Sequence, residues 1–303
     1  MSTETAQRST PAGVAPRRRR VRPVRILLHV FLIFTALSFL APLLWTVYTS
    51  LRPYADTAKR GYVSLPGTLN FDNYVDAWNQ AEIPKYYLNT LIVTVPGVIL
   101  TLLLASFVAF GVSRFSWRGN VALLILFTAG NLLPQQILLI PLYRLYLKVP
   151  LPWQMSDSEL LYDSYWGIIA IHVAFQIGFC TFVLSNYMKT LPIELTEAAI
   201  VDGASVWRQY WQVILPLCKP AMAALATLEF TWIYNDLLWA LVLLPTGEKK
   251  PIVAGLANLG GLFFKDDNLI AAGSMLAAIP TLVVYFALQR HFIGGLTLGG
   301  TKG

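Results

Sequence analysis

The chain has 303 residues, of which 56% are hydrophobic and only 13% are charged. Because soluble domains carry about 25% charged residues, this composition excludes an ordinary water-soluble domain and indicates lipid as the solvent. The formal net charge of +7 would also suit a nucleic-acid-binding protein. The densest basic cluster, however, directly precedes the first apolar run, where anionic lipid head groups attract it, so no nucleic-acid partner is expected.

The chain starts with a basic segment, residues 1–25, that has no apolar periodicity and is predicted to be a disordered tail. Residues 26–303 are predicted to form one membrane domain. A bilayer-crossing helix needs roughly 20 mostly apolar residues, and six runs meet that requirement. In chain order they are Ile26–Val47, Leu88–Val112, Val121–Leu142, Tyr165–Met188, Pro220–Leu244 and Leu269–Leu288.

Helices are expected because backbone N–H and C=O groups in hydrocarbon must be paired within the segment, and the runs lack the alternation of barrel strands. The predicted fold class is therefore an all-α integral membrane protein with six transmembrane helices. Pro134 is expected to kink the third helix. A seventh apolar run, Pro251–Phe264, is too short and too rich in glycine to cross, so we expect a re-entrant or interfacial segment.

The distribution of Lys and Arg predicts the orientation. Six crossings place both termini on one side, and the segments on that side would hold fourteen of the 23 Lys and Arg residues. The three opposite loops would hold nine, although together they are longer. Since cytoplasmic loops are enriched in these residues, both termini and the long loop 189–219 are predicted to be cytoplasmic.

Loop 189–219 is predicted to form two short amphipathic helices. Pro192 suits a first helical turn and Gly203 suits a left-handed stop, so Pro192–Asp202 is expected to be helical. Ser205 is expected to cap a second helix, Val206–Leu215, which Pro216 would end. The loop is far longer than most links between packed helices, which favours a docking site for a partner protein over a plain connector.

One motif in this loop resembles a known family. Glu197-Ala198-Ala199 and Gly203, followed after nine residues by Val213-Ile214-Leu215-Pro216, is similar to the EAA loop of binding-protein-dependent ABC importer permeases. Only Val213 departs from the pattern, replacing an isoleucine. The resemblance implies a coupling helix that sits in a cleft of an ATPase subunit. The coupling residues that it implies here are Glu197, Ala198, Ala199, Asp202, Gly203, Leu215 and Pro216.

The resemblance extends along most of the chain and is closest to the carbohydrate-uptake branch. It includes Asn73-Tyr74, Asn89-Thr90, and the final segment Gly295–Gly303, which is similar to the C-terminal tail of a maltose-transporter permease. It implies a permease subunit of an ABC type I importer, in a bacterial inner membrane, that moves a sugar or oligosaccharide. The implied partners are a second permease subunit, a cytoplasmic ATPase dimer, an extracellular solute-binding protein and the lipid bilayer.

The sequence contains no GxxxxGK[ST] phosphate loop, so ATP and Mg²⁺ are expected on the partner ATPase, with no cofactor on this chain and no enzyme activity of its own. The three histidines, His29, His172 and His291, lie in different spans and are interpreted as packing or interfacial residues rather than metal ligands. Cys180 and Cys218 have no metal-binding or disulfide spacing and are interpreted as small buried residues.

Polar residues inside the spans are the candidates for the substrate pathway, because buried polar groups in a membrane are costly and need a protein or water environment. Amide, carboxylate and aromatic side chains would suit the hydroxyl groups of a sugar. Interhelical hydrogen bonding is the alternative explanation for each residue. The candidates are Asn131, Gln135, Gln176, Glu229, Trp232, Asn235 and Asp236.

Two other functions stay open on the residues alone. An ion-coupled secondary transporter would use Glu229 and Asp236 as proton or cation sites, but no clear inverted repeat is found. A membrane enzyme or anchor would need a nucleophile–base pair or a loop without a docking partner. The outer stretch Lys148–Tyr165 is expected either to meet the binding protein or to be a solvated insertion.

Overall fold

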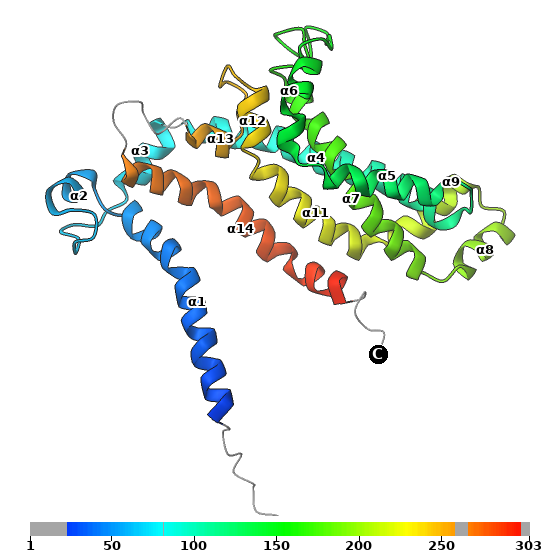
Figure 1. Cartoon of the computed structure of the whole chain (residues 1–303), viewed down its shortest axis with the longest axis horizontal. Helices are drawn as coiled ribbons and strands as arrows, with labels where there is room; N and C mark the ends of the chain where they lie inside the picture. The colour runs from blue at the N-terminus through cyan, green and yellow to red at the C-terminus, as the bar shows by residue number, and fades with distance from the viewer. Residues whose placement is uncertain (1–22, 81, 258–265, 298–303) are drawn as a thin grey trace, which may run out of the picture. The chain divides into compact units, whose positions relative to one another are not determined.

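The computed structural model describes residues 23–80, 82–257 and 266–297, and their regular structure is helical. The predicted tail up to residue 22, the 258–264 part of the predicted re-entrant segment and the last residues of the family-like tail lie outside the described residues. The first helix up to Trp45 forms one compact unit, and the chain from Thr46 onward forms a second (Figure 1).

The helices follow one another in a simple order along the chain. They are α1 (Pro23–Ser50), α2 (Tyr54–Arg60), α3 (Asp72–Gln80), α4 (Ile83–Arg114), α5 (Asn120–Leu132), α6 (Gln135–Tyr146), α7 (Tyr165–Thr190), α8 (Glu194–Val201), α9 (Val206–Arg208), the π-helix η1 (Gln209–Ile214), α10 (Leu215–Leu217), α11 (Lys219–Tyr234), α12 (Leu238–Leu243), α13 (Ile252–Leu256) and α14 (Asp267–Thr297).

Four described helices are long and apolar enough to cross a membrane: Val24–Ser50, Ile83–Arg114, Tyr165–Thr190 and Asp267–Gln289. Two bent pairs raise the number to six if each pair is one crossing. The first pair is α5 with α6, bent by 96°. The second is Val206–Leu217 with Lys219–Tyr234, bent by 73°.

Two of the predicted spans differ in detail. The kink expected at Pro134 is a complete break, because Leu133 and Pro134 are extended and separate α5 from α6. The run Pro220–Leu244 is not one helix, since α11 stops at Tyr234 and α12 begins at Leu238. The Asp236 carboxylate accepts bonds from the backbone N–H groups of Trp239 and Ala240, which starts a new helix instead of continuing the old one.

The core of the second unit is the long pair α4 and α7, against which α5 and α11 pack. Small residues let these helices approach closely, as in other membrane bundles. A side chain on Gly178 of α7 would collide with the backbone of Phe127 in α5, so the contact between α5 and α7 requires glycine there. Cys180 and Cys218 are free and buried, as the sequence predicted.

A buried arginine organises the segment that follows α1. Arg52 is 1% exposed, and its guanidinium donates to the Asp56 carboxylate at 2.7 Å, the Ser64 hydroxyl at 2.6 Å and the Gly61 carbonyl at 3.0 Å. Asn268, at the start of α14, donates to the backbone carbonyl of Arg52 at 2.8 Å. These bonds fold residues 52–67 into a compact cap, which we call the Arg52 cap, at the first turn of α14.

Asparagines in the family-like motifs tie other loops to the helix ends. Asn73 donates to the carbonyl groups of Ser50 and Arg52 at 2.9 and 2.8 Å. Asn89 donates to the carbonyl of Glu248 at 2.8 Å and accepts a bond from the Tyr165 hydroxyl at 2.6 Å. The loops at this end of the second unit are therefore held by buried side-chain amides rather than by strands.

An ion pair and hydrogen bonds also join the stretch between α6 and α7 to the loop after α12. Lys249 lies 2.7 Å from the Asp157 carboxylate and donates to the Asp163 carbonyl at 3.0 Å, and the Thr246 hydroxyl lies 3.1 Å from the Asp163 carboxylate. The Lys249 ammonium holds the pKa of Asp157 below its usual range. This segment, predicted as an outer loop, is thus a folded structure joined to the loop after α12.

Candidate functional site

The loop between α7 and α11 contains the predicted helix–bend–helix. The first helix, α8, begins at Glu194, two residues later than predicted, because the first helical turn closes on the carbonyl of Ile193 rather than at Pro192. At its end the Gly203 N–H donates to the Ile200 carbonyl, and the Ala204 N–H donates to the Ala199 carbonyl. This is a Schellman ending, and Gly203 has the left-handed φ of +71° that the sequence predicted.

The second helical segment starts as predicted and ends later. The Ser205 hydroxyl accepts a bond from the Arg208 N–H at 3.3 Å and so caps α9. Pro216 does not end the segment, because the helix runs through η1 and α10 to Leu217 before it bends at Cys218. The wider π-turn directly before Pro216 fits a proline that has no N–H to donate to the preceding turn.

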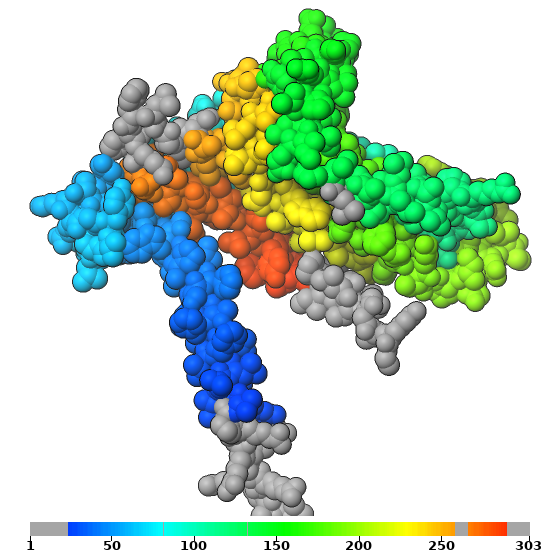
Figure 2. Space-filling view, viewed as in Figure 1, coloured from blue at the N-terminus to red at the C-terminus, as the bar shows by residue number. Residues whose placement is uncertain are grey.

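One face of α8 is apolar and acidic and is not covered by other described elements, whereas the opposite face packs against η1. Ile200 and Val201 are 58% and 86% exposed, and the side chains of Glu197 and Ala198 are also exposed. Ala199 faces inward and is buried. Figure 2 shows this segment at the molecular surface, in yellow-green. Asp202, Gly203 and Pro216 are exposed and Leu215 is half-buried.

Aromatic rings attach the second helical segment to α4. The ring of Tyr210 stacks on Phe107 with centroids 4.5 Å apart, and its hydroxyl lies 2.6 Å from the Ser106 hydroxyl. Trp207 stacks on the same Phe107 at 5.5 Å. Since α4 packs against α7 and α11, these rings join the loop to the central helices of the bundle.

Replacing Tyr210 should separate the two roles of this contact. Tyr210→Phe removes one buried hydrogen bond and should cost about 1 kcal/mol, whereas Tyr210→Ala also removes the ring and should cost about 3–5 kcal/mol. Thermal unfolding of the purified chain in detergent measures both variants. A Tyr210→Ala protein as stable as the native chain would show that the aromatic cluster does not hold η1 on α4.

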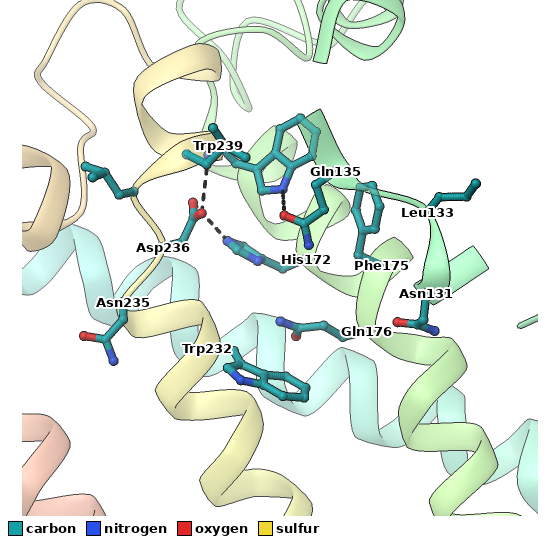
Figure 3. Close-up of a pocket in the computed structure, with 12 residues that line it drawn as sticks. Asn131, Leu133, Gln135, His172, Phe175, Gln176, Trp232, Asn235, Asp236 and Trp239 are labelled. Carbon is teal, nitrogen blue, oxygen red and sulfur yellow. Dashed lines mark hydrogen bonds and ion pairs between the residues drawn. The ribbon is translucent and has the colours of Figure 1, made fainter. Parts of the chain in front are cut away.

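A polar cavity lies where the two helix breaks meet α7. Its volume is about 530 Å³, within the usual range for small-ligand sites. Its polar and aromatic lining comes from the break between α5 and α6, from α7, and from the break between α11 and α12 (Figure 3). The lining residues are Asn131, Leu133, Gln135, His172, Phe175, Gln176, Trp232, Asn235, Asp236, Leu237, Leu238 and Trp239.

A short chain of contacts joins the two breaks across the cavity. Nε2 of His172 lies 3.5 Å from the Asp236 carboxylate, which also caps α12. Trp239, in the first turn of α12, donates through Nε1 to Oε1 of Gln135 at 3.2 Å. The ends of α6 and α12 are therefore held together by side chains that line the cavity (Figure 3).

Six of the seven predicted pathway residues line this one cavity: Asn131, Gln135, Gln176, Trp232, Asn235 and Asp236. Glu229 does not. It is fully buried between α7 and α11, where the Cys180 thiol donates to its carboxyl group at 3.1 Å. Among the described residues, the buried Oε1 of Gln176 has no hydrogen-bond partner, so it is free to accept one from a ligand.

Sequence reasoning missed the other six lining residues, which are three leucines together with His172, Phe175 and Trp239. His172 was interpreted as a packing residue, although it lies one helical turn before Gln176 on α7 and so shares its face. Trp239 carried no comparable signal, because the hydropathy of Pro220–Leu244 does not show the break that places it in the lining. Within the described segments no group of three His, Cys, Asp or Glu residues could hold a metal ion.

Comparisons with known proteins give the family. The diacetylchitobiose uptake system permease protein NgcG of Streptomyces coelicolor is 31% identical over 273 residues, which cover 89% of this chain and 87% of that protein. The galactooligosaccharides transport system permease protein GanQ of Bacillus subtilis is 32% identical, with 93% and 97% covered. A bacterial ABC transporter involved in the import of the acidic polysaccharide alginate has a similar chain, with a TM-score of 0.73, 25% identity, and 93% and 100% covered.

The family model for binding-protein-dependent transport system inner membrane components matches residues 97–294. This match includes the bent loop α8–α10, the cavity and α14 up to residue 294, so both candidate sites lie within the matched region. The chain belongs to the family of binding-protein-dependent transport system inner membrane components, and it is a permease subunit of an ABC importer rather than an enzyme.

Proposed function

We propose that this chain is the membrane-crossing permease subunit of an ATP-driven importer that carries a sugar or oligosaccharide into a bacterial cell. The family match and the sugar-transport names of its relatives support this proposal. The strongest structural support is the exposed apolar and acidic face of α8. This helix has a Schellman ending, and the segment after it packs on α4.

The proposed topology has six crossings of the inner membrane, with both termini and the segment 189–219 in the cytoplasm. The four long apolar helices and the two bent pairs supply six crossings. The excess of Lys and Arg on one side supports the orientation. In this arrangement residues 26–303 are the permease domain and the Arg52 cap faces outward.

Coupling to ATP hydrolysis would pass through Glu197, Ala198, Ala199, Asp202 and Gly203 on α8, together with Leu215 and Pro216. ATP and Mg²⁺ would be bound by a cytoplasmic ATPase dimer, whose closure would push α8. The stacked contact of Tyr210 with Phe107 would pass this movement to α4. Gly203 would keep the bend, since its left-handed φ suits glycine.

The substrate path would run past the cavity at the two helix breaks. Irregular backbone at membrane depth is tolerated where it lines a cavity, and the amide and carboxylate groups there suit sugar hydroxyls. A second, related permease would complete the path, and a solute-binding protein would deliver the sugar to the outer loops, including the stretch Lys148–Tyr165. Glu229, away from the cavity, would serve interhelical packing.

Affinity purification of the tagged chain in mild detergent, with mass spectrometry of the proteins that co-elute, tests this proposal. The expected result is an ATPase with a nucleotide-binding loop and a second six-span permease. Membrane vesicles from the same cells should take up the sugar with ATP and not with an ion gradient alone. A chain that elutes without an ATPase and transports on a proton or sodium gradient would instead establish an ion-coupled transporter.

A further inference from the structure

The cavity between the helix breaks contains one carboxylate and no fixed cation. Asp236 is its acid, and among the described residues that line it none is Lys or Arg. The Asp236 carboxylate is held in place by the N–H groups of Trp239 and Ala240 at 3.3 and 3.1 Å. Its negative charge therefore has a fixed position in the wall.

His172 is the group in the lining that could offset this charge. Its Nε2 lies 3.5 Å from the Asp236 carboxylate, and its side chain is 6% exposed. A protonated His172 would make the pair neutral, and a neutral His172 would leave the cavity negative. In neither state does the described lining carry a net positive charge, so an anionic ligand gains no net electrostatic attraction there.

The rest of the lining suits a neutral, hydroxyl-rich ligand. Side-chain amides come from Asn131, Gln135, Gln176 and Asn235, and each amide offers both donors and acceptors. Trp232, which is 47% exposed, offers a flat apolar face beside them. The buried Oε1 of Gln176 lacks a partner among the described residues and would accept a bond from a hydroxyl donor.

The fold itself does not decide the charge of the substrate. The similar solved structure comes from a transporter involved in the import of an acidic polysaccharide, whereas relatives of comparable length are named for galactooligosaccharides and diacetylchitobiose. Selection by charge would therefore rest on side chains along the path, such as those at the helix breaks.

We infer that this cavity admits uncharged sugars and excludes sugars that carry carboxylate groups, and that Asp236 is the residue that imposes this selection. The inference rests on the proposed function, because it assigns a substrate class to the proposed pathway. A uronic acid that entered would leave its hydration shell and approach a fixed carboxylate of like charge.

A charge-sensitive thiol probe measures this property without knowledge of the natural sugar. Asn235→Cys places a thiol in the cavity wall, and the native Cys180 and Cys218 are both fully buried and serve as unreactive background. The detergent-solubilised complex is treated at pH 8 with a cationic trimethylammonium-ethyl or an anionic sulfonatoethyl methanethiosulfonate. Each rate is divided by the rate of the same reagent with 2-mercaptoethanol.

The cationic reagent should then react at least about fivefold faster than the anionic one, and Asp236→Asn should bring the two rates together. Asn131→Cys provides a second reporter on another wall if Asn235→Cys assembles poorly. Asp157→Asn is the matched control, since it removes an equally charged but 88% exposed side chain outside the cavity and should leave the ratio unchanged.

Equal normalised rates in the native background, or a faster anionic reagent, would overturn the inference. Failure of both reagents to react would also overturn it, because a cavity closed to such small molecules takes no sugar. In each of these cases the ATPase would still co-purify with the chain. Failure of this inference is therefore distinguishable from failure of the proposed importer function.

Discussion

Glu197→Lys combined with Gly203→Asp should lower ATP-driven uptake at least about tenfold, while the amount of the chain in the membrane stays unchanged. Both residues are exposed, and a Cβ added at Gly203 would meet no described atom within 4 Å apart from its chain neighbours. Glu197→Lys therefore acts on the docked partner, whereas Gly203→Asp adds a charge at that surface and also strains the left-handed turn. A charge reversal in the centre of an interface typically costs 2 kcal/mol or more, and 1.4 kcal/mol is a tenfold change in affinity. Co-purification should show the ATPase lost and the second permease retained.

Two variants serve as controls for this result. Glu194→Lys makes the same charge change one turn earlier on α8, outside the family-like motif, and should reduce uptake much less. Gly203→Asn introduces an uncharged residue that tolerates the left-handed conformation. This variant should co-purify with more of the ATPase than Gly203→Val does. Normal uptake by the double variant would show that Glu197 and Gly203 do not couple α8 to the ATPase. An equal loss of uptake in Glu194→Lys would contradict the assignment in the same way.

The bend in the cytoplasmic loop was predictable because its determinants are local. Glycine at a left-handed position and serine at a helix start act through the adjacent backbone, so Gly203 and Ser205 could be assigned from sequence alone. The length of the second helical segment was not predictable in the same way. Whether Pro216 ends a helix depends on the π-turn before it, and that turn follows from how Tyr210 packs on α4.

The cavity could be predicted only in part. The search for polar residues within apolar runs identified six of its lining residues, because a polar group in hydrocarbon is costly unless protein or water surrounds it. The same argument also selected Glu229, which the structure places beside Cys180 and away from the cavity. Polarity alone does not distinguish a residue that faces a cavity from one that faces a neighbouring helix.

The position of the second helix break depended on contacts that the sequence does not display. The run Pro220–Leu244 is continuously apolar apart from a few polar residues, so its hydropathy favours one long helix. Asp236 instead caps α12 and lies near His172, a residue 64 positions earlier in the chain by their numbering. Long-range pairs of this kind decide where a helix breaks, and composition does not encode them.

Arg52→Ala should open the Arg52 cap to trypsin. In spheroplasts, trypsin should cleave the variant after Lys59 or Arg60 at least about tenfold faster than the native chain. Both cleavage sites lie in α2, where they are protected as long as the cap is folded. Without the guanidinium, the Asp56 carboxylate keeps only Arg60 and the Gly67 N–H as partners, and the Gly61 carbonyl keeps only Ser64. A hydrogen bond to a charged group contributes about 1.5–3 kcal/mol, and the buried Arg52 makes several, which is why the expected effect is large.

The matched control is Arg60→Ala, which removes the other, 53% exposed partner of Asp56 and leaves Lys59 as a cleavage site. Its effect should be small, because exposed ion pairs contribute little. Arg52 also holds the pKa of Asp56 below its usual range, so the pair is intact above that lowered pKa and is lost as the pH falls through it. The native cap should thus resist protease at neutral pH and loosen only in strong acid, whereas Asp56→Asn should loosen it at pH 7. Equal cleavage of Arg52→Ala and Arg60→Ala would mean that the buried guanidinium does not hold the cap together.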